Sequence, residues 1–138
     1  MRKFSERSLR NLEGVHPDLV RVVHKALEIC EVDFTVVEGV RTLETQRKYF
    51  ERGASKTMKS RHLVQADGFA HAVDIYPYYA GSVQVHAPFA KFRAIADAIR
   101  EAARQLCVNV TWGADWDRDG DTGDERFVDA PHYQIELA

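Results

Sequence analysis

The chain has few cysteines and little net charge, and none of its apolar runs is long enough to cross a bilayer. Neither Cys30 nor Cys107 has another Cys or a His at metal-ligand spacing, so two buried free thiols are expected rather than a disulfide or a metal site. The basic N-terminus is not followed by an apolar segment of the kind that a secretory signal needs. We therefore expect a chain without signal peptide or stable membrane anchor, made in the cytoplasm.

The composition is that of one ordinary folded domain. The net charge of -2 is too small to indicate nucleic acid as a partner, and the 45% hydrophobic content is enough for one core in 138 residues. There are no internal repeats and no low-complexity linker. One domain over residues 1–138 is expected, and we expect it to be a monomer.

Helices and strands are interspersed along the chain. Apolar residues at helical spacing, with Ser5, Thr42 and two prolines at the starts, predict helices over 5–12, 17–30, 42–52 and 88–106. Short β-branched or alternating segments predict strands over 34–40, 72–76, 108–112 and 132–137, the second of them stopped by Pro77. Long loops separate these strands. The pattern favours an α+β domain with a small antiparallel sheet flanked by helices.

Three short motifs contain residue types that bind metals or stabilise negative charge: Ser60-Arg-His62 with Ala70-His-Ala-Val-Asp74, Asp129-Ala-Pro-His132, and Gly39-Val-Arg41-Thr42. A catalytic zinc ion takes three protein ligands and keeps one open position for water. His62, Asp74 and His132 meet that need, the latter two from strands that would present both side chains on one sheet face. Spacing alone leaves each of them open to another role, as a surface residue or a hydrogen-bonded core residue.

These motifs resemble the Ser-x-His, Gly-x-Ala-x-Asp and Asp-x-x-His pattern of the zinc D-alanyl-D-alanine carboxypeptidases and L-alanyl-D-glutamate peptidases. The stretch Trp112-Gly-Ala-Asp-Trp116 and the Gly-x-Arg-Thr element are similar to further parts of that pattern, so the resemblance covers nearly the whole chain. It is closest to short phage endolysins of the L-alanyl-D-glutamate peptidase type. It implies the hedgehog/DD-peptidase-like fold and a zinc cofactor.

The chain departs from the pattern at two places. The distance from His62 to Asp74 is longer than in the family, so residues within Leu63–Phe69 look inserted, and Ala70 stands where the pattern has glycine. The insertion leaves His71 as a competing ligand. We prefer His62 because it follows Ser60 in the motif, and we expect His71 to contact substrate, to support a ligand or simply to be exposed.

The resemblance also implies roles for residues beside the metal. Asp129 would be the general base, the alternative being a simple turn residue. Arg41 would stabilise the oxyanion or bind a substrate carboxylate, the alternative being a structural salt bridge. Gln46 and Ser60 are expected to contact substrate, although Gln46 is equally well explained as a solvent-facing helix residue.

An acidic segment before Asp129 resembles the start of an EF-hand calcium loop. Carboxylates stand at the first, third and fifth positions and Gly120 at the sixth, but the glutamate falls one position early and the flanking helices are missing. We expect calcium binding in preference to a solvated acidic turn, through Asp115, Asp117, Asp119, Asp121 and Glu125.

Three functions follow as hypotheses. The first is an L-alanyl-D-glutamate endopeptidase that cuts peptidoglycan as a phage lysis enzyme, made in the host cytoplasm and reaching the cell wall and periplasm by holin-type release. The second is a D-alanyl-D-alanine carboxypeptidase with the same zinc chemistry. The third is a metal-binding interaction domain that has lost catalysis.

Overall fold

The computed structural model describes residues 3–55, 57–123 and 128–137. The helices in this part of the chain are α1 (Glu6–Leu12), α2 (Pro17–Ile29), α3 (Leu43–Glu51) and α4 (Phe89–Leu106). The strands are β1 (Phe34–Glu38), β2 (Ala72–Tyr79), β3 (Ser82–Val83), β4 (Val110–Trp112) and β5 (His132–Ile135). The expected helices are all present, and none of the described helices is long and apolar enough to cross a membrane.

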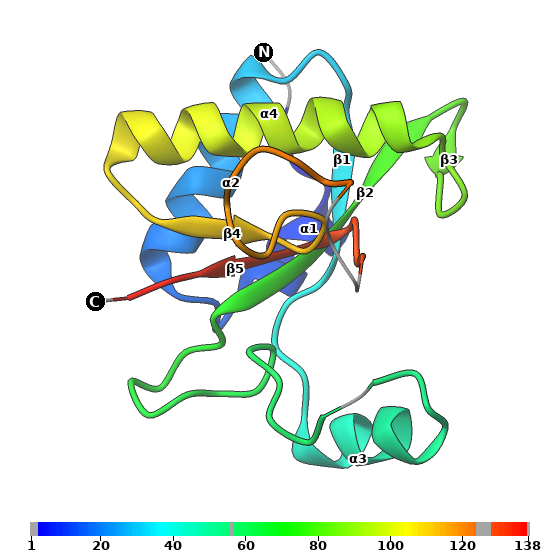
Figure 1. Cartoon of the computed structure of the whole chain (residues 1–138), viewed down its shortest axis with the longest axis vertical. Coiled ribbons are helices and arrows are strands. Elements are labelled where there is room, and N and C mark those ends of the chain that lie inside the picture. The colour runs from blue at the N-terminus through cyan, green and yellow to red at the C-terminus, as the bar shows by residue number, and fades with distance from the viewer. Residues whose placement is uncertain (1–2, 56, 124–127, 138) are drawn as a thin grey trace.

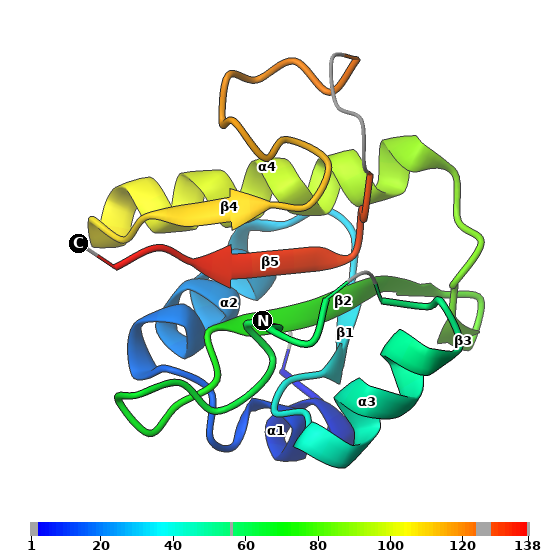
Figure 2. The ribbon, with the colours of Figure 1, turned by 60° about the horizontal axis from the view of Figure 1, so that its bottom comes forward.

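The strands form an antiparallel sheet in the order β1-β2-β5-β4, with β3 paired to the far end of β2 (Figure 1). Helices α2 and α4 pack together and against the sheet, whereas α3 lies apart from them (Figures 1 and 2). The α+β fold with a small antiparallel sheet is therefore confirmed.

The sheet has one apolar and one polar face because side chains alternate along each strand. Val73 and Ile75 of β2 and Tyr133 of β5 are fully buried in the core with α2 and α4. The alternate residues Asp74 and His132 point to the other face, and the register pairs them directly across β2 and β5. The hydrophobic pattern that fixes the core therefore also fixes which side chains meet on the opposite face.

The helix ends follow from local chemistry. The side-chain oxygen of Ser5 accepts a hydrogen bond from the backbone N–H of Ser8 at 3.2 Å, and that of Thr42 accepts one from Thr45 at 3.1 Å. These bonds satisfy N–H groups that a first helical turn leaves without a partner. The cap at Thr42 matters most for function, because it starts α3 directly after Arg41.

Two expectations were wrong. Strand β2 does not stop at Pro77 but runs through it to Tyr79. Pro77 pairs with Phe34 at the start of β1, and the neighbouring Tyr78 N–H donates to the carbonyl of Asp33 at 2.9 Å, so the missing proline N–H costs no ladder bond. Cys107 is exposed rather than buried, because it caps α4 in a left-handed conformation at φ 57. Neither cysteine forms a disulfide among the described residues, and Cys30 is buried as expected.

Candidate metal centre

Three ligand-type side chains converge on the polar face of the sheet. His62, from the loop after α3, places Nε2 at 3.2 Å from Oδ1 of Asp74, and His132 places Nδ1 at 3.3 Å from the same oxygen. The candidate ligand atoms of the three residues all lie within 4.8 Å of one another. This convergence agrees with the prediction from sequence, including the adjacent positions of Asp74 and His132 on neighbouring strands.

Each imidazole is oriented by an acceptor on its other nitrogen. Nδ1 of His62 lies 2.8 Å from the carbonyl oxygen of Gly39, which can only accept, so this nitrogen carries the proton. Nε2 of His132 lies 2.9 Å from Oε1 of Gln134, whose amide nitrogen donates to Glu136 at 2.7 Å. These acceptors orient both rings so that the other nitrogen of each faces Asp74, where loss of its proton would leave it able to bind a metal ion. A metal-binding histidine is commonly oriented by such a partner.

The pKa shifts of Asp74 and His132 show that this site attracts positive charge. Burial would raise the pKa of Asp74, but hydrogen bonds with His132 and His62 outweigh it and hold the pKa well below its ordinary value. Burial would likewise lower the pKa of His132, but the hydrogen bond and negative charge of Asp74 raise it. The Asp74 carboxylate thus attracts positive charge to the place where a nitrogen of His62 and a nitrogen of His132 face it. A zinc ion fits this set of donors in number and kind.

Arg41 lies beside this centre in an ion pair with Glu38. Its Nε donates to Oε1 of Glu38 at 3.0 Å, Nη2 also bonds that oxygen, and Nη1 donates to Gln46 at 2.7 Å. Nη2 lies 4.0 Å from Oδ2 of Asp74. The salt-bridge alternative is therefore present in the structure, and it holds the guanidinium next to the candidate ligands. Sequence reasoning missed Glu38, although its position three residues before Arg41 was a usable signal.

Gln46 and Ser60 support the centre in different ways. Gln46 is fully buried, so it is not a solvent-facing helix residue. Its side-chain oxygen accepts a hydrogen bond from Arg41, and its amide nitrogen donates to Ser55 and to the carbonyl of Thr57. The predicted contact between Gln46 and substrate therefore gains no support from the structure. The hydroxyl of Ser60 accepts a hydrogen bond from the N–H of His62 at 3.1 Å and lies in the cavity described below, so its predicted contact with substrate stays a prediction.

His71 lies away from the three candidate ligands. Its Nε2 is 2.7 Å from Oδ2 of Asp67, and its ring contacts that of His16 with centroids 5.6 Å apart. The hydrogen bond with His71 is the main cause that lowers the pKa of Asp67. Because Asp67 belongs to Leu63–Phe69, this contact ties the apparent insertion to the body of the domain. The structure therefore separates His71 from the centre and does not support it as a competing ligand.

Asp129 takes part in a turn and also reaches the site. Its N–H donates to the carbonyl of Gly113 at 2.7 Å, and its own carbonyl accepts from His132 at 3.0 Å. A side chain at Gly113 would collide with the Asp129 carbonyl, so this close approach requires glycine. Burial, followed by the charge of Asp74, raises the pKa of the Asp129 carboxyl. Gly113 and Trp112, whose indole donates to the carbonyl of Ala130 at 2.7 Å, hold this turn. Both lie in a stretch that the resemblance included, but no role was predicted for them.

The acidic loop brings together only part of the expected calcium set. Asp115, Asp117 and Asp119 have carboxylate oxygens within 4.8 Å of one another, and Asp121 bonds the N–H of Gly123 instead. Asp115 is buried and accepts hydrogen bonds from Arg100 at 2.9 Å and from Gly120 at 2.9 Å. Burial and the neighbouring acids raise the pKa of Asp117 to about 6. Glu125 lies outside the described residues. Calcium binding gains no support here and stays a prediction from sequence.

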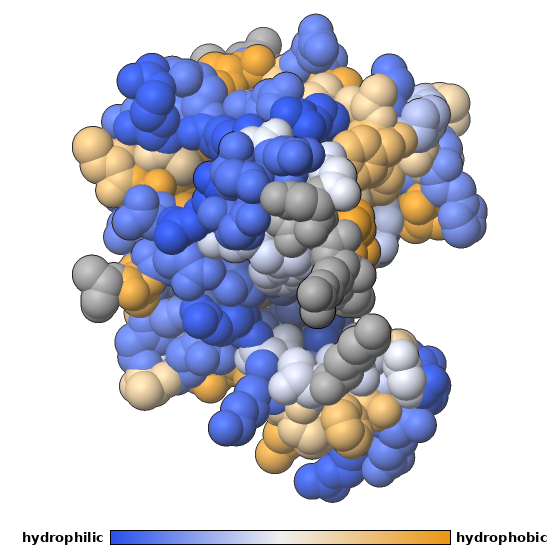
Figure 3. Space-filling model, viewed as in Figure 1, coloured by the Kyte–Doolittle hydropathy of each residue, from blue (hydrophilic) through white to orange (hydrophobic). Residues whose placement is uncertain are grey.

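A cavity of about 900 Å³ opens onto the candidate ligands. Its walls include His62, Asp74, His132, Arg41 and Asp129, together with residues of α3 and the loop that follows it. Figure 3 shows the molecule hollowed between the part around α3, at the bottom, and the rest of the domain. The cavity is as large as the clefts that bind ligands, and it places a candidate base and a guanidinium beside the same three side chains.

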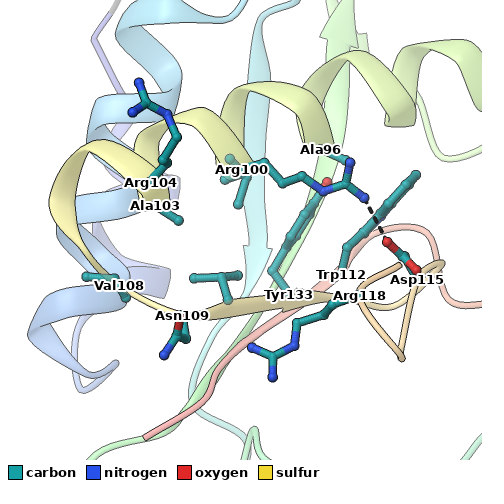
Figure 4. Close-up of a pocket in the computed structure, with 12 residues that line it drawn as sticks. Ala96, Arg100, Ala103, Arg104, Val108, Asn109, Trp112, Asp115, Arg118 and Tyr133 are labelled. Atoms are coloured by element: carbon teal, nitrogen blue, oxygen red, sulfur yellow. Dashed lines mark hydrogen bonds and ion pairs between the residues drawn. The ribbon is translucent and has the colours of Figure 1, made fainter. Parts of the chain in front are cut away.

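A smaller cavity of about 260 Å³ lies between α4 and β4 (Figure 4). Arg100 spans its mouth and bonds Asp115, and Trp112 and Tyr133 form part of its wall. None of the three candidate ligands lines it. It is therefore separate from the centre described above.

This fold and this site define a hydrolase with a candidate His-Asp-His metal centre in an open cleft. The profile of the phage L-alanyl-D-glutamate peptidases matches residues 1–137. The chain belongs to that family and is a peptidase of the class that acts on peptidoglycan.

Three relatives illustrate the similarity. The L-alanyl-D-glutamate peptidase of Escherichia phage T5 is 32% identical over 126 residues, which cover 89% of this chain and 88% of that protein. The L-Ala D-Glu endopeptidase ChiX of Serratia marcescens has 40% identity and a TM-score of 0.78, over 96% of this chain and 89% of that one. The vancomycin-resistance D,D-dipeptidase VanXYg, solved with a D-Ala-D-Ala phosphinate analogue, has 17% identity and a TM-score of 0.50 over 88% and 50% of the chains. This last match shows a shared fold alone.

Proposed function

We propose that this protein hydrolyses the bond between L-alanine and D-glutamate in peptidoglycan stem peptides, with zinc held by His62, Asp74 and His132. The observation that carries the proposal is the convergence of these three side chains within 4.8 Å, in a cavity that Asp129 and Arg41 also line. The choice of bond is supported by two relatives that are named for it, one from phage T5 and one from Serratia marcescens.

When bound, a zinc ion supplies Lewis acidity, which polarises a carbonyl group and brings the pKa of water close to neutrality. Asp129 accepts the proton of the attacking water and returns it to the amine of the leaving D-glutamate. Its raised pKa suits a group that must hold a proton between these two steps. The carboxylate lies three positions before His132, in the turn that Gly113 and Trp112 hold.

Arg41 stabilises the negative charge that develops on the scissile carbonyl oxygen. Three of its five N–H donors bond Glu38 and Gln46, and the other two form no hydrogen bond with the described residues. The ion pair with Glu38 holds the guanidinium in one orientation, and the hydrogen bond with Gln46 supports the same orientation. Orientation before the reaction is what makes such a donor effective, because no reorganisation is then needed.

The protein serves in lysis of the bacterial host, as its membership of a phage family suggests. It is made in the host cytoplasm and reaches the wall by holin-type release, and it acts as a monomer. Expression in bacteria with and without a membrane-permeabilising holin tests the route. Rapid loss of turbidity only when both are present supports it, and lysis by the peptidase alone contradicts it.

Digestion of purified peptidoglycan tests the proposed bond. The zinc-loaded protein is expected to create new amino groups on D-glutamate, detected by end-group labelling and mass spectrometry. Release of free D-alanine without new D-glutamate termini would instead support the D-alanyl-D-alanine carboxypeptidase. An Asp129→Asn variant that still binds zinc is the matched control, because it keeps the fold and removes only the base.

A further inference from the structure

The cavity beside the candidate metal centre has an uneven distribution of charge. The three acidic residues that line it, Glu38, Asp74 and Asp129, belong to the centre or lie next to it. Four basic residues line it as well: Arg41, Arg52, Lys59 and Arg61. The basic residues other than Arg41 come from the C-terminal cap of α3 and the loop after it. A substrate in the cavity therefore meets positive charge from this segment.

Two of these cations have their charge already compensated. Arg41 forms its ion pair with Glu38, and Arg61 lies 3.6 Å from Glu136. Arg52 and Lys59 differ, since neither has a carboxylate within 4.0 Å among residues 3–55, 57–123 and 128–137. Both residues are exposed to solvent at the cavity. Their charge is thus available to a ligand.

Tyr49 places Arg52 next to the catalytic arginine. The guanidinium carbon of Arg41 lies 4.7 Å from the centre of the Tyr49 ring, and that of Arg52 lies 5.0 Å from it. One ring therefore orders both guanidinium groups, a contact that favours a planar cation over a flexible ammonium. Since Arg41 lies beside Asp74, the shared ring connects Arg52 to the side of the cavity that holds the centre.

We propose that Arg52, ordered by Tyr49 and assisted by Lys59, binds the glutamate carboxylate that is not part of the scissile peptide chain. This inference rests on the proposed function, because a glutamate on the amine side of the cleaved bond has one carboxylate that is outside the peptide chain. A guanidinium bonds a carboxylate through two parallel N–H groups, which gives both affinity and orientation. Arg52 is therefore a specificity-determining residue that selects an acidic residue on the amine side of the cleaved bond.

Two synthetic stem peptides test this inference, one with the spare glutamate carboxylate free and one with it converted to an amide. The zinc-loaded wild type is expected to cleave the free form with about tenfold higher kcat/KM, the size expected for one exposed charge-assisted hydrogen-bonded contact. In Arg52→Gln, KM for the free form should rise about tenfold while kcat stays the same, so that the preference disappears. Lys59→Gln should reduce the preference in part, and Arg52→Lys should restore some of it.

Arg47→Gln is the matched control. Arg47 is an exposed arginine of the same helix that does not line the cavity, so its loss changes the net charge equally and should leave the preference intact. Zinc content and thermal midpoint confirm that each variant is folded. Equal cleavage of the two peptides by the wild type would overturn the inference, as would a full preference in the Arg52→Gln, Lys59→Gln double variant. Cleavage of neither peptide by the wild type would instead refute the proposed function, and the inference would fall with it.

Discussion

The side-chain oxygen of Gln134 lies 2.9 Å from Nε2 of His132, and the opposite nitrogen of that ring faces Asp74. Gln134 therefore selects which nitrogen of His132 is free to bind a metal. Loss of such an orienting partner commonly costs about 10–100-fold in metal affinity or activity, and we expect Gln134→Ala to weaken zinc binding by this amount. Competition with a chromophoric chelator measures the affinity.

Gln134→Glu is the control for this prediction, because it keeps an acceptor oxygen at the same position and should bind zinc nearly as well as the wild type. Equal zinc affinity in Gln134→Ala and the wild type would show that the ring needs no such partner.

Asp129→Asn should lower kcat by about 10²–10⁴-fold while zinc remains bound, since general acid–base catalysis contributes about that much. Burial and the charge of Asp74 raise the pKa of this carboxyl, so it becomes protonated, and inactive as a base, at a higher pH than an ordinary aspartate. The acid limb of kcat/KM should therefore lie above about pH 4. Zinc content measured at each pH separates this loss from loss of the metal.

Activity that survives unchanged in Asp129→Asn would contradict the role of Asp129 as the general base. The turn around Asp129 would then be structural, and another group would have to supply the base.

Arg41→Lys should lower kcat by about 10²-fold with little change in zinc content, because one ammonium group cannot bond Glu38 and Gln46 and still face the substrate. Arg47→Lys, on the exposed face of α3, is the matched control and should be silent. Steady-state kinetics on a stem peptide measure both variants. If Arg41→Lys changes KM alone, Arg41 binds a substrate carboxylate rather than the developing oxyanion.

Tyr133→Phe should stabilise the fold by about 1 kcal/mol, because the buried phenol oxygen has no hydrogen-bond partner among the described residues. Burial also raises the pKa of Tyr133 well above its ordinary value. A raised pKa contributes stability that is complete below the unfolded pKa, about 10, and is lost as the pH rises beyond it. Urea unfolding should therefore show an alkaline loss of stability in the wild type that is smaller in Tyr133→Phe. A destabilised variant would mean that the hydroxyl is satisfied.

The helices and strands followed from sequence where one local rule dominated. Caps at Ser5 and Thr42 and the apolar stripe of α4 depend on neighbouring residues alone, and these elements lie where expected. Pro77 shows the limit of such reasoning. A proline ends a strand only if its missing N–H is needed, and this depends on the pairing with Phe34, which is distant in sequence.

The candidate site likewise has residues that could be predicted from sequence and residues that could not. His62, Asp74 and His132 were found because their motifs resemble those of a known family, and the sheet register brings them together. The residues that orient them are harder to predict. Gln134 and Glu38 act only through contacts with other side chains, and the burial of Gln46 depends on how α3 packs against the loop around Ser55. No local pattern contains that information.

Zinc content tests the central claim most directly. Elemental analysis of the purified protein, and of His62→Ala and Asp74→Ala variants prepared in parallel, should be combined with activity before and after chelation. The account predicts about one zinc ion per wild-type chain, little in either variant, and activity that chelation abolishes and zinc restores. Full activity in metal-free protein, or unchanged zinc content in both variants, would contradict it.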